Sequence, residues 1–413
     1  MFEMTTEEGI LTLTINEVGT LTLAILLLIL GSLIKKKFTF LQTYFIPAPV
    51  IGGFVFAILH TFLRGFNILQ FNMDTLFQDP FMIFFYVTIG ISATFGLLKK
   101  GGKQLFMYFI STAFIIVTLA LMSVGLASLF SIEPLLGLIS GPPSLAGGHG
   151  SVASYAPSIE DLGYENIMVV GMAVATAGLI GGSALGGPVS KRLIKKYNLK
   201  NNTIEENDDL ANERPKQKNI NTKETNANTI LVYIAVITVC MTIGGFITDL
   251  LVNNISGFVL PSFAIPLILA LFIRNMNDKV NLIHIDLNLN DKFSDIALGI
   301  FLSMALMTLP LWELVDLAIP ILGIFIVEVF IVVLFVYFIV FRLLGSNYDA
   351  AVMCGGLIGH GLGATPNAIA NMDAIAEKHG RSKIAFIIVP AVGGFMQDWI
   401  LIPITITAIN LLS

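Results

Sequence analysis

Charged residues are scarce in this sequence. Asp, Glu, Lys and Arg together make up 12% of the 413 residues, and hydrophobic residues make up 55%. Soluble domains carry about 25% charged residues. A composition this poor in charge excludes an ordinary soluble protein and indicates a chain that crosses a membrane many times.

Cysteine is scarcer still, and the start of the chain lacks positive charge. Cys240 and Cys354 both fall in apolar segments, so we expect neither a disulfide framework nor a metal site from them. Glu3, Glu7 and Glu8 occupy the region in which a cleaved signal peptide carries basic residues, so no such peptide is predicted. The sequence also offers no nucleophile–base pair and no metal-ligand spacing, which makes an intramembrane enzyme the least favoured class.

Ten apolar stretches of about 20 residues predict membrane-spanning helices. Between the fifth and the sixth stretch, the segment 198–228 is rich in Asn, Lys and Glu, which predicts a disordered or loosely ordered polar linker. The linker separates an N-terminal unit, 1–197, from a C-terminal unit, 229–413. The ten stretches lie at about 17–34, 44–64, 80–98, 104–130, 165–190, 229–251, 258–273, 293–310, 314–341 and 383–411.

Two glycine-rich stretches, 141–151 and 355–367, interrupt this pattern, and each contains Gly-His-Gly. Gly and Pro at this density disfavour a continuous helix, yet neither stretch contains Lys or Arg. Irregular backbone at membrane depth occurs only where it is buried in protein or lines a watery cavity. We therefore predict two re-entrant hairpins, at about 134–160 and 347–375, that meet near the bilayer centre.

The distribution of Lys and Arg orients the chain, because these residues concentrate on the cytoplasmic side. With the N-terminus outside, ten spans and two hairpins leave only Arg64 of the 23 Lys and Arg residues on the outer side. This topology places both termini outside and the polar linker in the cytoplasm.

The two units also match each other in sequence order. His149 corresponds to His360, and Gly181-Gly182 corresponds to Gly393-Gly394, at separations of 211 and 212 residues. Five spans per unit is an odd number, so the second copy is inverted relative to the first. The predicted fold is therefore all-α and polytopic, with two inverted repeats of five transmembrane helices plus one re-entrant hairpin each. Inverted repeats with broken helices at the midplane are typical of secondary transporters.

Nine short motifs carry a resemblance to a known family. They are Ile46–Gly53, Asp79–Met82, Thr88–Gly90, Gly147–Gly150, Met304–Met307, Leu311–Leu314, Asn347–Val352, Gly361–Pro366 and Ala368–Met372. In these motifs the chain resembles the bacterial sodium/glutamate symporters over nearly its whole length. The resemblance implies an elevator-type carrier of the bacterial inner membrane that forms a homodimer and imports L-glutamate with sodium as the co-transported ion.

Residues in both hairpins have the chemistry of an anion site. Thr365 is a good N-cap and Pro366 suits the first helical position, so we expect a helix whose N-terminal amides point into the cavity and favour an anion. Ser151 is expected to cap a second such helix, and both Gly-His-Gly histidines to hold their hairpins by hydrogen bonds. The predicted substrate-binding residues are Gly148, His149, Gly150, Ser151, Gly361, Gly363, Ala364, Thr365 and Asn367.

Intramembrane carboxylates predict where the cation binds. Asp398 lies deep in the last span, and no span carries Lys or Arg near its centre. A charged residue at that depth marks a functional site by default, and sodium, like other hard cations, takes oxygen ligands. The predicted sodium ligands are Asp398, Asn371 and Asp373. Glu328, in the preceding span, is interpreted as a protonated packing residue in preference to a second functional site.

The leading hypothesis is thus a sodium-coupled glutamate symporter, with L-glutamate, sodium and the lipid bilayer as partners and no nucleic acid. Within the same class, a sodium- or proton-coupled carrier of another small carboxylate is the alternative. A channel is a more distant alternative, because pores usually show filter-like or charge-ring residues, and the sequence contains no such pattern.

Overall fold

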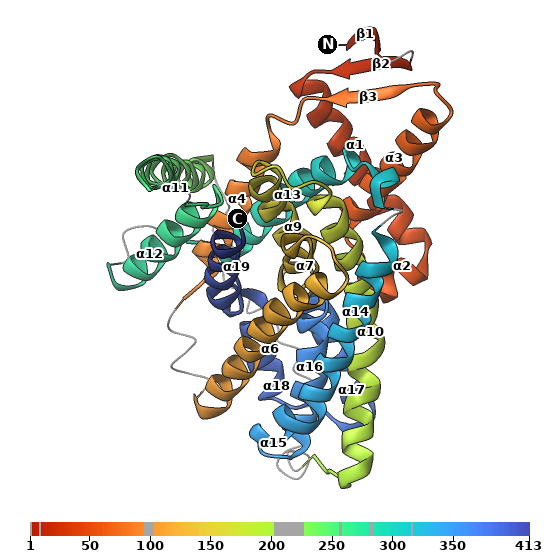
Figure 1. Cartoon of the computed structure of the whole chain (residues 1–413). Helices are drawn as coiled ribbons and strands as arrows, with labels where there is room; N and C mark the ends of the chain where they lie inside the picture. Colours follow the sequence, from red (N-terminus) through yellow and green to blue (C-terminus); the bar gives the residue numbers. More distant parts are fainter. Residues whose placement is uncertain are drawn as a thin grey trace.

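The structure is a computed structural model that describes residues 2–7, 10–94, 102–201, 227–255, 258–280, 285–314 and 317–413. Most of the predicted linker, 202–226, lies outside the described residues. The chain folds mostly into helices, and a small sheet caps one end of the molecule (Figure 1).

The first half of the chain contains nine described helices. They are α1 (Glu17–Lys37), α2 (Thr39–Thr43), α3 (Ala48–Gly65), α4 (Gln78–Ser92), α6 (Gly102–Leu129), α7 (Pro134–Ser140), α8 (Pro142–Leu145), α9 (Gly148–Glu160) and α10 (Ile167–Tyr197). We call α7, α8 and α9 together hairpin 1. The glycine-rich stretch 141–151 contains α8 and the first turn of α9.

The second half repeats this order of long helices. Its elements are α11 (Ala227–Asn254), α12 (Ala264–Val280), α13 (Leu287–Met307), the 3-10 turn η3 (Leu311–Leu314), α14 (Ala318–Phe335), η4 (Val336–Val340), α15 (Phe341–Leu343), α16 (Tyr348–Gly361), α17 (Thr365–His379), α18 (Ala385–Ala391), η5 (Val392–Met396) and α19 (Asp398–Leu412). Helices α16 and α17 form what we call hairpin 2. Segments η4 and η5 are π-helical, so the last two predicted spans are continuous but irregular.

Seven helical stretches in the described chain are long and apolar enough to cross a membrane. The predicted spans at 80–98, 258–273 and 293–310 correspond to α4, α12 and α13, which are not among the seven. Helix α4 has 15 residues and α12 has 17, fewer than the roughly 20 that cross the hydrocarbon core unaided. Helix α13 begins with polar and charged residues. The prediction of a multi-pass helical membrane protein is confirmed.

The prediction of an all-α fold is wrong at the N-terminus. Strands β1 (Phe2–Glu7) and β2 (Ile10–Ile15) pair antiparallel, and β3 (Gln70–Met73) adds to β2 in parallel. The sequence of β2 alternates Leu11, Leu13 and Ile15 with threonines, which is the period-2 pattern typical of a strand. Burial does not follow this alternation, because Thr12 is buried and Leu11 is exposed.

The long helices pack into two groups. The first helix group comprises α1, α3, α4, α11, α12 and α13, and the second comprises α6, hairpin 1, α10, α14, hairpin 2 and α18 to α19. Glycines allow close approach within the first group: a Cβ on Gly31 of α1 would meet the backbone of Ala48 in α3, and one on Gly52 of α3 would meet the backbone of Leu27 in α1. The two groups meet along a surface that contains both hairpin tips.

Candidate functional site

A cavity of about 340 Å³ lies between the two helix groups. The first group contributes an apolar and aromatic wall, and the second group contributes the hairpin tips and the irregular start of α19. The wall residues are Phe45, Pro47, Phe85, Tyr86, Ile89, Leu298 and Leu302; the opposite side is lined by Ala146 to Ser151, Leu179, Gly363 to Pro366, Gly393, Gly394, Gln397 and Asp398. Its size and mixed lining are those of a small-molecule site.

The tips of the two hairpins meet at this cavity. Gly148 has a φ of 69°, a left-handed conformation that favours glycine. A Cβ placed on Gly148 would lie 3.6 Å from the carbonyl oxygen of Gly363. The two glycine-rich stretches, more than 200 residues apart in the sequence, are therefore side by side in the fold.

Helix α9 begins at the cavity, with Gly147 as the N-cap and no side chain capping it. Ser151 lies in the first turn and does not cap the helix, contrary to the prediction, because the helix starts three residues earlier at Gly148. The first N–H groups of a helix have no partner within the helix. The start of α9 therefore presents donors and a partial positive charge to the cavity.

Helix α17 also begins at the cavity, but Thr365 is its first helical residue and Ala364 is the N-cap. The Thr365 hydroxyl donates to the Gly393 carbonyl at 2.6 Å. This carbonyl lies in η5, where the π-helical turn disrupts the usual ladder. The predicted helix start is correct, and the predicted capping role of the Thr365 hydroxyl is wrong, because the hydroxyl ties hairpin 2 to η5 instead.

The donors that α17 offers are few. Pro366 has no N–H, and the N–H of Asn367 donates to the Ala364 carbonyl at 3.0 Å. An anion in the cavity would thus find more backbone donors at the start of α9 than at the start of α17.

The His149 side chain is held by α10. Its Nε2 lies 2.9 Å from the Thr176 hydroxyl oxygen, and this hydroxyl donates its proton to the Met172 carbonyl at 2.8 Å. The hydroxyl can therefore only accept from the imidazole, so Nε2 carries the proton and Nδ1 is the acceptor. A ring fixed in this way orients the hairpin tip and is not available as a metal ligand through Nε2.

His360 is fully buried and lies behind the cavity. The Gln397 amide nitrogen donates to the Ala146 carbonyl at 2.9 Å, which turns the Gln397 oxygen toward His360 Nδ1 at 3.0 Å. Nδ1 therefore carries the proton, and Nε2 accepts from the Tyr108 hydroxyl at 2.8 Å. This chain of hydrogen bonds links α6, hairpin 2, the last span and the tip of hairpin 1.

Four predicted residues of hairpin 2 do not line the cavity. Asn367 is fully buried, and its amide nitrogen donates to the Leu179 carbonyl and the Ser183 hydroxyl. Asn371 donates to the carbonyls of Gly182 and Gly355. Gly361 is buried and does not contribute to the lining. Asp373 is exposed on α17, away from the cavity.

Asp398 is the single charged residue among the described residues that line the cavity. It is the first residue of α19 and shares the lining with Gly394 and Gln397. Within the described chain its carboxylate takes part in no ion pair. The cavity thus combines one negative side chain with helix N-termini that favour an anion.

The aromatic wall was not predicted. Phe85 and Tyr86 come from α4, and Leu298 and Leu302 from α13. They belong to ordinary apolar runs, and no local pattern separates them from core residues. Gln397 does carry a signal in the sequence, because an amide within a span indicates a hydrogen-bonded role.

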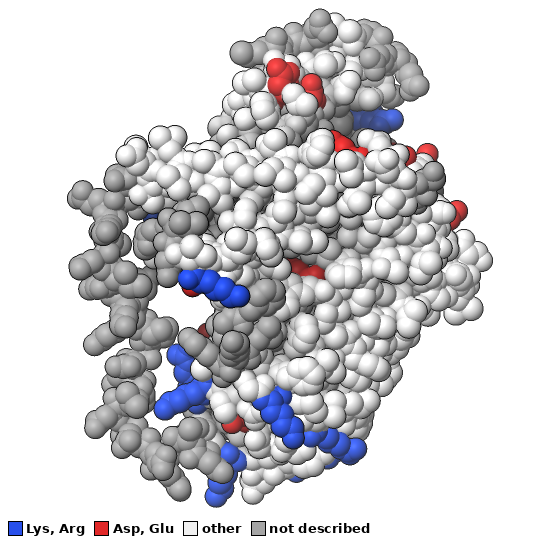
Figure 2. Space-filling view, turned by 90° about the vertical axis from the view of Figure 1, so that its left-hand side faces the viewer, with Lys and Arg blue, Asp and Glu red and all other residues white. Residues whose placement is uncertain are grey.

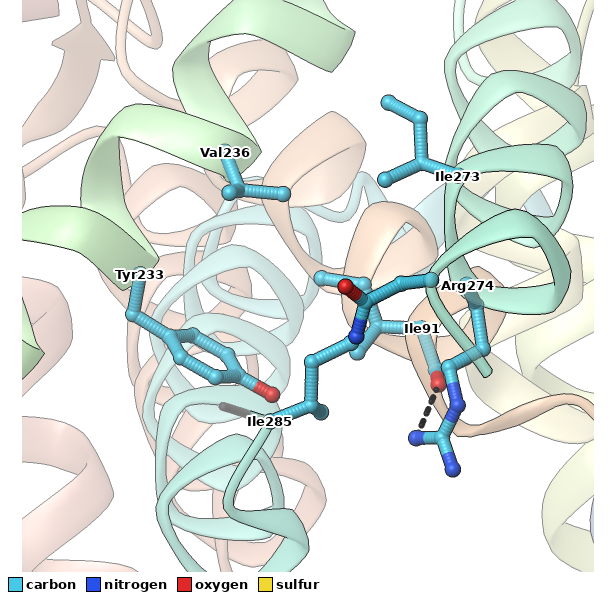
Figure 3. Close-up of a pocket in the computed structure, with 7 residues that line it drawn as sticks. Ile91, Tyr233, Val236, Ile273, Arg274 and Ile285 are labelled. Atoms are coloured by element: carbon cyan, nitrogen blue, oxygen red, sulfur yellow. Dashed lines mark hydrogen bonds between the residues drawn. The ribbon is translucent and has the colours of Figure 1, made fainter. Parts of the chain in front are cut away.

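A second cavity, at the ends of α4 and α12, has only about 10 Å³ of space. Figure 3 shows Tyr233 and Val236 of α11 on one side and Ile273 and Arg274 of α12 on the other. The Arg274 guanidinium donates to the Ile91 carbonyl at 3.1 Å, at the end of α4. A space of this size holds about one water, so this junction is structural.

No group of three or more His, Cys, Asp and Glu side chains that could hold a metal ion occurs in the described part of the chain. The site is therefore defined by hairpin tips, helix ends and one carboxylate. A multi-pass helical protein with two such hairpins around an internal cavity belongs to the class of membrane transporters.

Comparison with known proteins assigns the family. The family model described as sodium/glutamate symporter matches residues 13–381. A sodium/glutamate symporter of Escherichia coli (strain K12) is 36% identical over 386 residues, covering 93% of this chain and 95% of the relative. One of Haemophilus influenzae is 35% identical over 407 residues, covering 97% and 99%. The chain belongs to the sodium/glutamate symporter family, a family of transporters and not of enzymes.

Proposed function

We propose that this protein imports L-glutamate together with sodium by alternating access. The observation that carries the proposal is the cavity between the two helix groups, lined by two hairpin tips, two helix N-termini and Asp398. The related proteins from Escherichia coli and Haemophilus influenzae bear the name sodium/glutamate symporter, and their similarity extends over nearly the full chain.

The anionic substrate binds at the hairpin tips in this proposal. The start of α9, Gly148 to Ser151, supplies backbone donors, and the start of α17, Gly363 to Thr365, closes the opposite side. No Lys or Arg lies among the described lining residues. The substrate charge is therefore offset by helix ends and by the co-transported cation, so that each ligand strengthens binding of the other.

Sodium binds through oxygen ligands, with Asp398 as the first candidate. A second candidate is Asn367, whose side-chain oxygen is buried and has no hydrogen-bond partner within the described chain. An orphaned buried acceptor is a natural cation ligand. Asn367 therefore fits a cation-binding role better than the substrate-binding role predicted for it. The positions of Asn371 and Asp373 give their predicted sodium role no support.

The transport step in this proposal is an elevator movement of the second helix group against the first. The repeats at 1–197 and 229–413 support it, because their long helices follow one another in the same order and the broken hairpins occupy the same place in each. A pair of hydrogen bonds joins the groups at one end: Asn410 of α19 accepts from the Val259 N–H at 2.6 Å and donates to the Val259 carbonyl at 2.7 Å. These bonds must break when the groups slide.

The membrane orientation follows from charge. On the face in Figure 2, most Lys and Arg lie toward the end opposite the β-sheet, and Asp and Glu gather near the sheet. By the positive-inside rule, the sheet end and both termini face the periplasm of a bacterial inner membrane. A homodimer is part of the same proposal, because the family resemblance implies it.

Uptake into proteoliposomes tests the function. We expect glutamate uptake only with an inward sodium gradient, and exchange of labelled glutamate against internal glutamate, which a channel does not perform. Uptake of another di- or tricarboxylate in preference to glutamate would favour the alternative carrier. Uptake driven equally by a proton gradient would contradict sodium coupling.

A further inference from the structure

Glu328 lies in the middle of α14, away from the cavity, and is fully buried. Both of its carboxyl oxygens have no hydrogen-bond partner within the described chain. It is the single acidic residue in the span Ala318–Leu343, which is otherwise the most apolar of the seven candidate spans. Buried polar groups are nearly always hydrogen-bonded, so this carboxyl group requires an explanation.

The carboxyl group faces the break in hairpin 1. Gly141, between α7 and α8, has no side chain, and a Cβ there would lie 3.1 Å from Glu328 Oε1 and 2.6 Å from the Ser123 hydroxyl oxygen of α6. The break is followed within one turn by Ala146, whose carbonyl accepts from Gln397 at the cavity. Glu328 is thus adjacent to the segment that carries the hairpin tip.

No basic group of the described chain forms an ion pair with Glu328. The elements packed against α14 are α6, α7, α10, α16 and η4. Hairpin helix α7 contains no titratable residue, and the Lys and Arg residues of α10 lie in its last two turns. On α16, His360 is bonded to Tyr108 of α6 and to Gln397, and the Cys354 thiol contacts the Val336 carbonyl of η4. The remaining titratable groups of these elements are Lys103, Tyr197, Tyr337, Tyr348 and Asp349, of which all but Tyr337 lie at helix ends.

A bare carboxylate at this depth is strongly disfavoured, and the packing around Gly141 leaves no room for a methyl group unless Ser123 shifts. A sodium ion with several oxygen ligands therefore does not fit beside Glu328 in this conformation, whereas a proton needs no additional space. We propose that Glu328 is a proton-binding site, and that its proton is released and rebound as the break of hairpin 1 moves. The second half of this inference rests on the proposed transport function.

A purely structural role explains the geometry less well. A permanently neutral carboxyl group would still leave a donor and an acceptor unpaired, and an apolar residue of similar size would avoid that penalty. Deprotonation, in contrast, places a negative charge against the hairpin break and Ser123. We infer that hairpin 1 moves readily when Glu328 is protonated and slowly when it is ionised, so that transport slows as the pH rises.

The proton site is tested without substrate by infrared difference titration of the reconstituted protein. We expect a protonated carboxyl band in the wild type that changes with pH and is absent in E328Q. If the wild type and E328Q show the same carboxyl bands at every pH, Glu328 is not a proton-binding site. This result does not depend on which substrate the protein transports.

The consequence for transport is tested by uptake at a fixed sodium gradient over a range of pH. We expect wild-type uptake to fall by about tenfold on the alkaline side, and E328Q, which keeps the size and the neutral form, to lose most of this dependence. Glu377→Gln, an exposed residue of the same helix group, is the matched control and should retain the wild-type profile. Gly141→Ala keeps the Glu328 carboxyl group but crowds it, and should shift the pH dependence of uptake. This variant tests the proposal if E328Q fails to fold.

Two outcomes would contradict the proposal directly. An E328Q profile identical to that of the wild type would return Glu328 to a packing role. An E328Q variant with altered sodium activation and unaltered pH dependence would show that the ligand is a metal cation. Failure of sodium-dependent glutamate uptake in the wild type would instead contradict the proposed function. The infrared titration would then still test whether Glu328 binds a proton.

Discussion

At the scale of single residues, the cavity depends on a few polar groups whose partners are defined. The Thr365 hydroxyl is bonded to the Gly393 carbonyl, and both His149 and His360 have their tautomers set by neighbours. Asp398 differs, since its carboxylate forms no ion pair in the described chain. The unpaired carboxylate is therefore the residue at which a mobile cation is expected to act.

We predict that Asp398→Asn raises the sodium concentration for half-maximal glutamate uptake by about tenfold, which corresponds to about 1.4 kcal/mol. The substitution keeps the size and one oxygen ligand and removes the charge that attracts the cation. Sodium activation curves in proteoliposomes measure the effect. Asp249→Asn, on the exposed side of α11, is the control. A wild-type curve for Asp398→Asn would exclude this residue from the cation site.

We predict that Thr365→Val weakens the apparent affinity for glutamate, because the Gly393 carbonyl loses its donor and the start of α17 loses its tie to η5. Leaving a buried acceptor unpaired costs about 1–3 kcal/mol. Thr365→Ser restores the hydroxyl and should recover most of the affinity. Thr238→Val removes an exposed hydroxyl that bonds only within α11, and should have no effect. Equal affinities for Thr365→Val and wild type would reduce the bond to a local structural role.

At the scale of elements, glycines determine how closely helices approach the hairpins. A Cβ on Gly178 of α10 would meet the Leu362 carbonyl, and one on Gly182 would lie 2.9 Å from the Gly359 carbonyl oxygen. A Cβ on Gly186 would run into the Asn371 amide and lie 2.6 Å from the Gly355 carbonyl oxygen. Helix α10 therefore holds hairpin 2 along three consecutive turns through direct backbone contact.

Gly187, the neighbour of Gly186 in α10, offers a matched comparison. A Cβ on Gly187 would find open space, so Gly187→Ala should be neutral or slightly stabilising, since Ala is the better helix former by about 1 kcal/mol. We predict that Gly186→Ala destabilises the protein by about 1–3 kcal/mol, the usual effect of overpacking. The fraction of monodisperse protein after heating in detergent measures both variants. Equal thermal stability of the two would show that α10 and hairpin 2 do not pack closely.

At the scale of the whole molecule, the two helix groups suggest how the cavity would open to either side of the membrane. The cavity wall from α4 and α13 belongs to one group, and both hairpin tips belong to the other. Relative movement of the groups would carry the hairpins and their ligands past the aromatic wall. The inverted repeat predicted from the sequence implies that the two hairpins enter from opposite faces of the membrane.

We predict that a cysteine at Ser158, at the exit of hairpin 1, is labelled by an impermeant thiol reagent from the periplasmic side only. A cysteine at Leu343, before hairpin 2, should be labelled from the cytoplasmic side only. Leu343 is exposed and is preferred to Gly345, whose φ of 104° disfavours a side chain. The background lacks Cys240 and Cys354, both of which are buried. Labelling of both positions from the same face would contradict the inverted repeat.

The sequence by itself determined the properties that depend on local composition. Long apolar runs require a membrane because their transfer to water is unfavourable, and the density of glycine in 141–151 and 355–367 prevents continuous helices. The same local rules placed a helix start at Thr365 and predict a functional role for the carboxylate of Asp398. Those predictions needed only the chain order of residues and their individual preferences.

The tertiary structure alone decided which residues share the cavity. The aromatic wall of α4 and α13 could not be separated from core positions, because both are apolar runs in the sequence. The bond from Thr365 to the Gly393 carbonyl depends on a π-helical turn in a different span, and Asn371 is held beside α10 by two backbone carbonyls. Such contacts join segments far apart in the chain, and their geometry results from the packing of whole helices, which local sequence preferences do not encode.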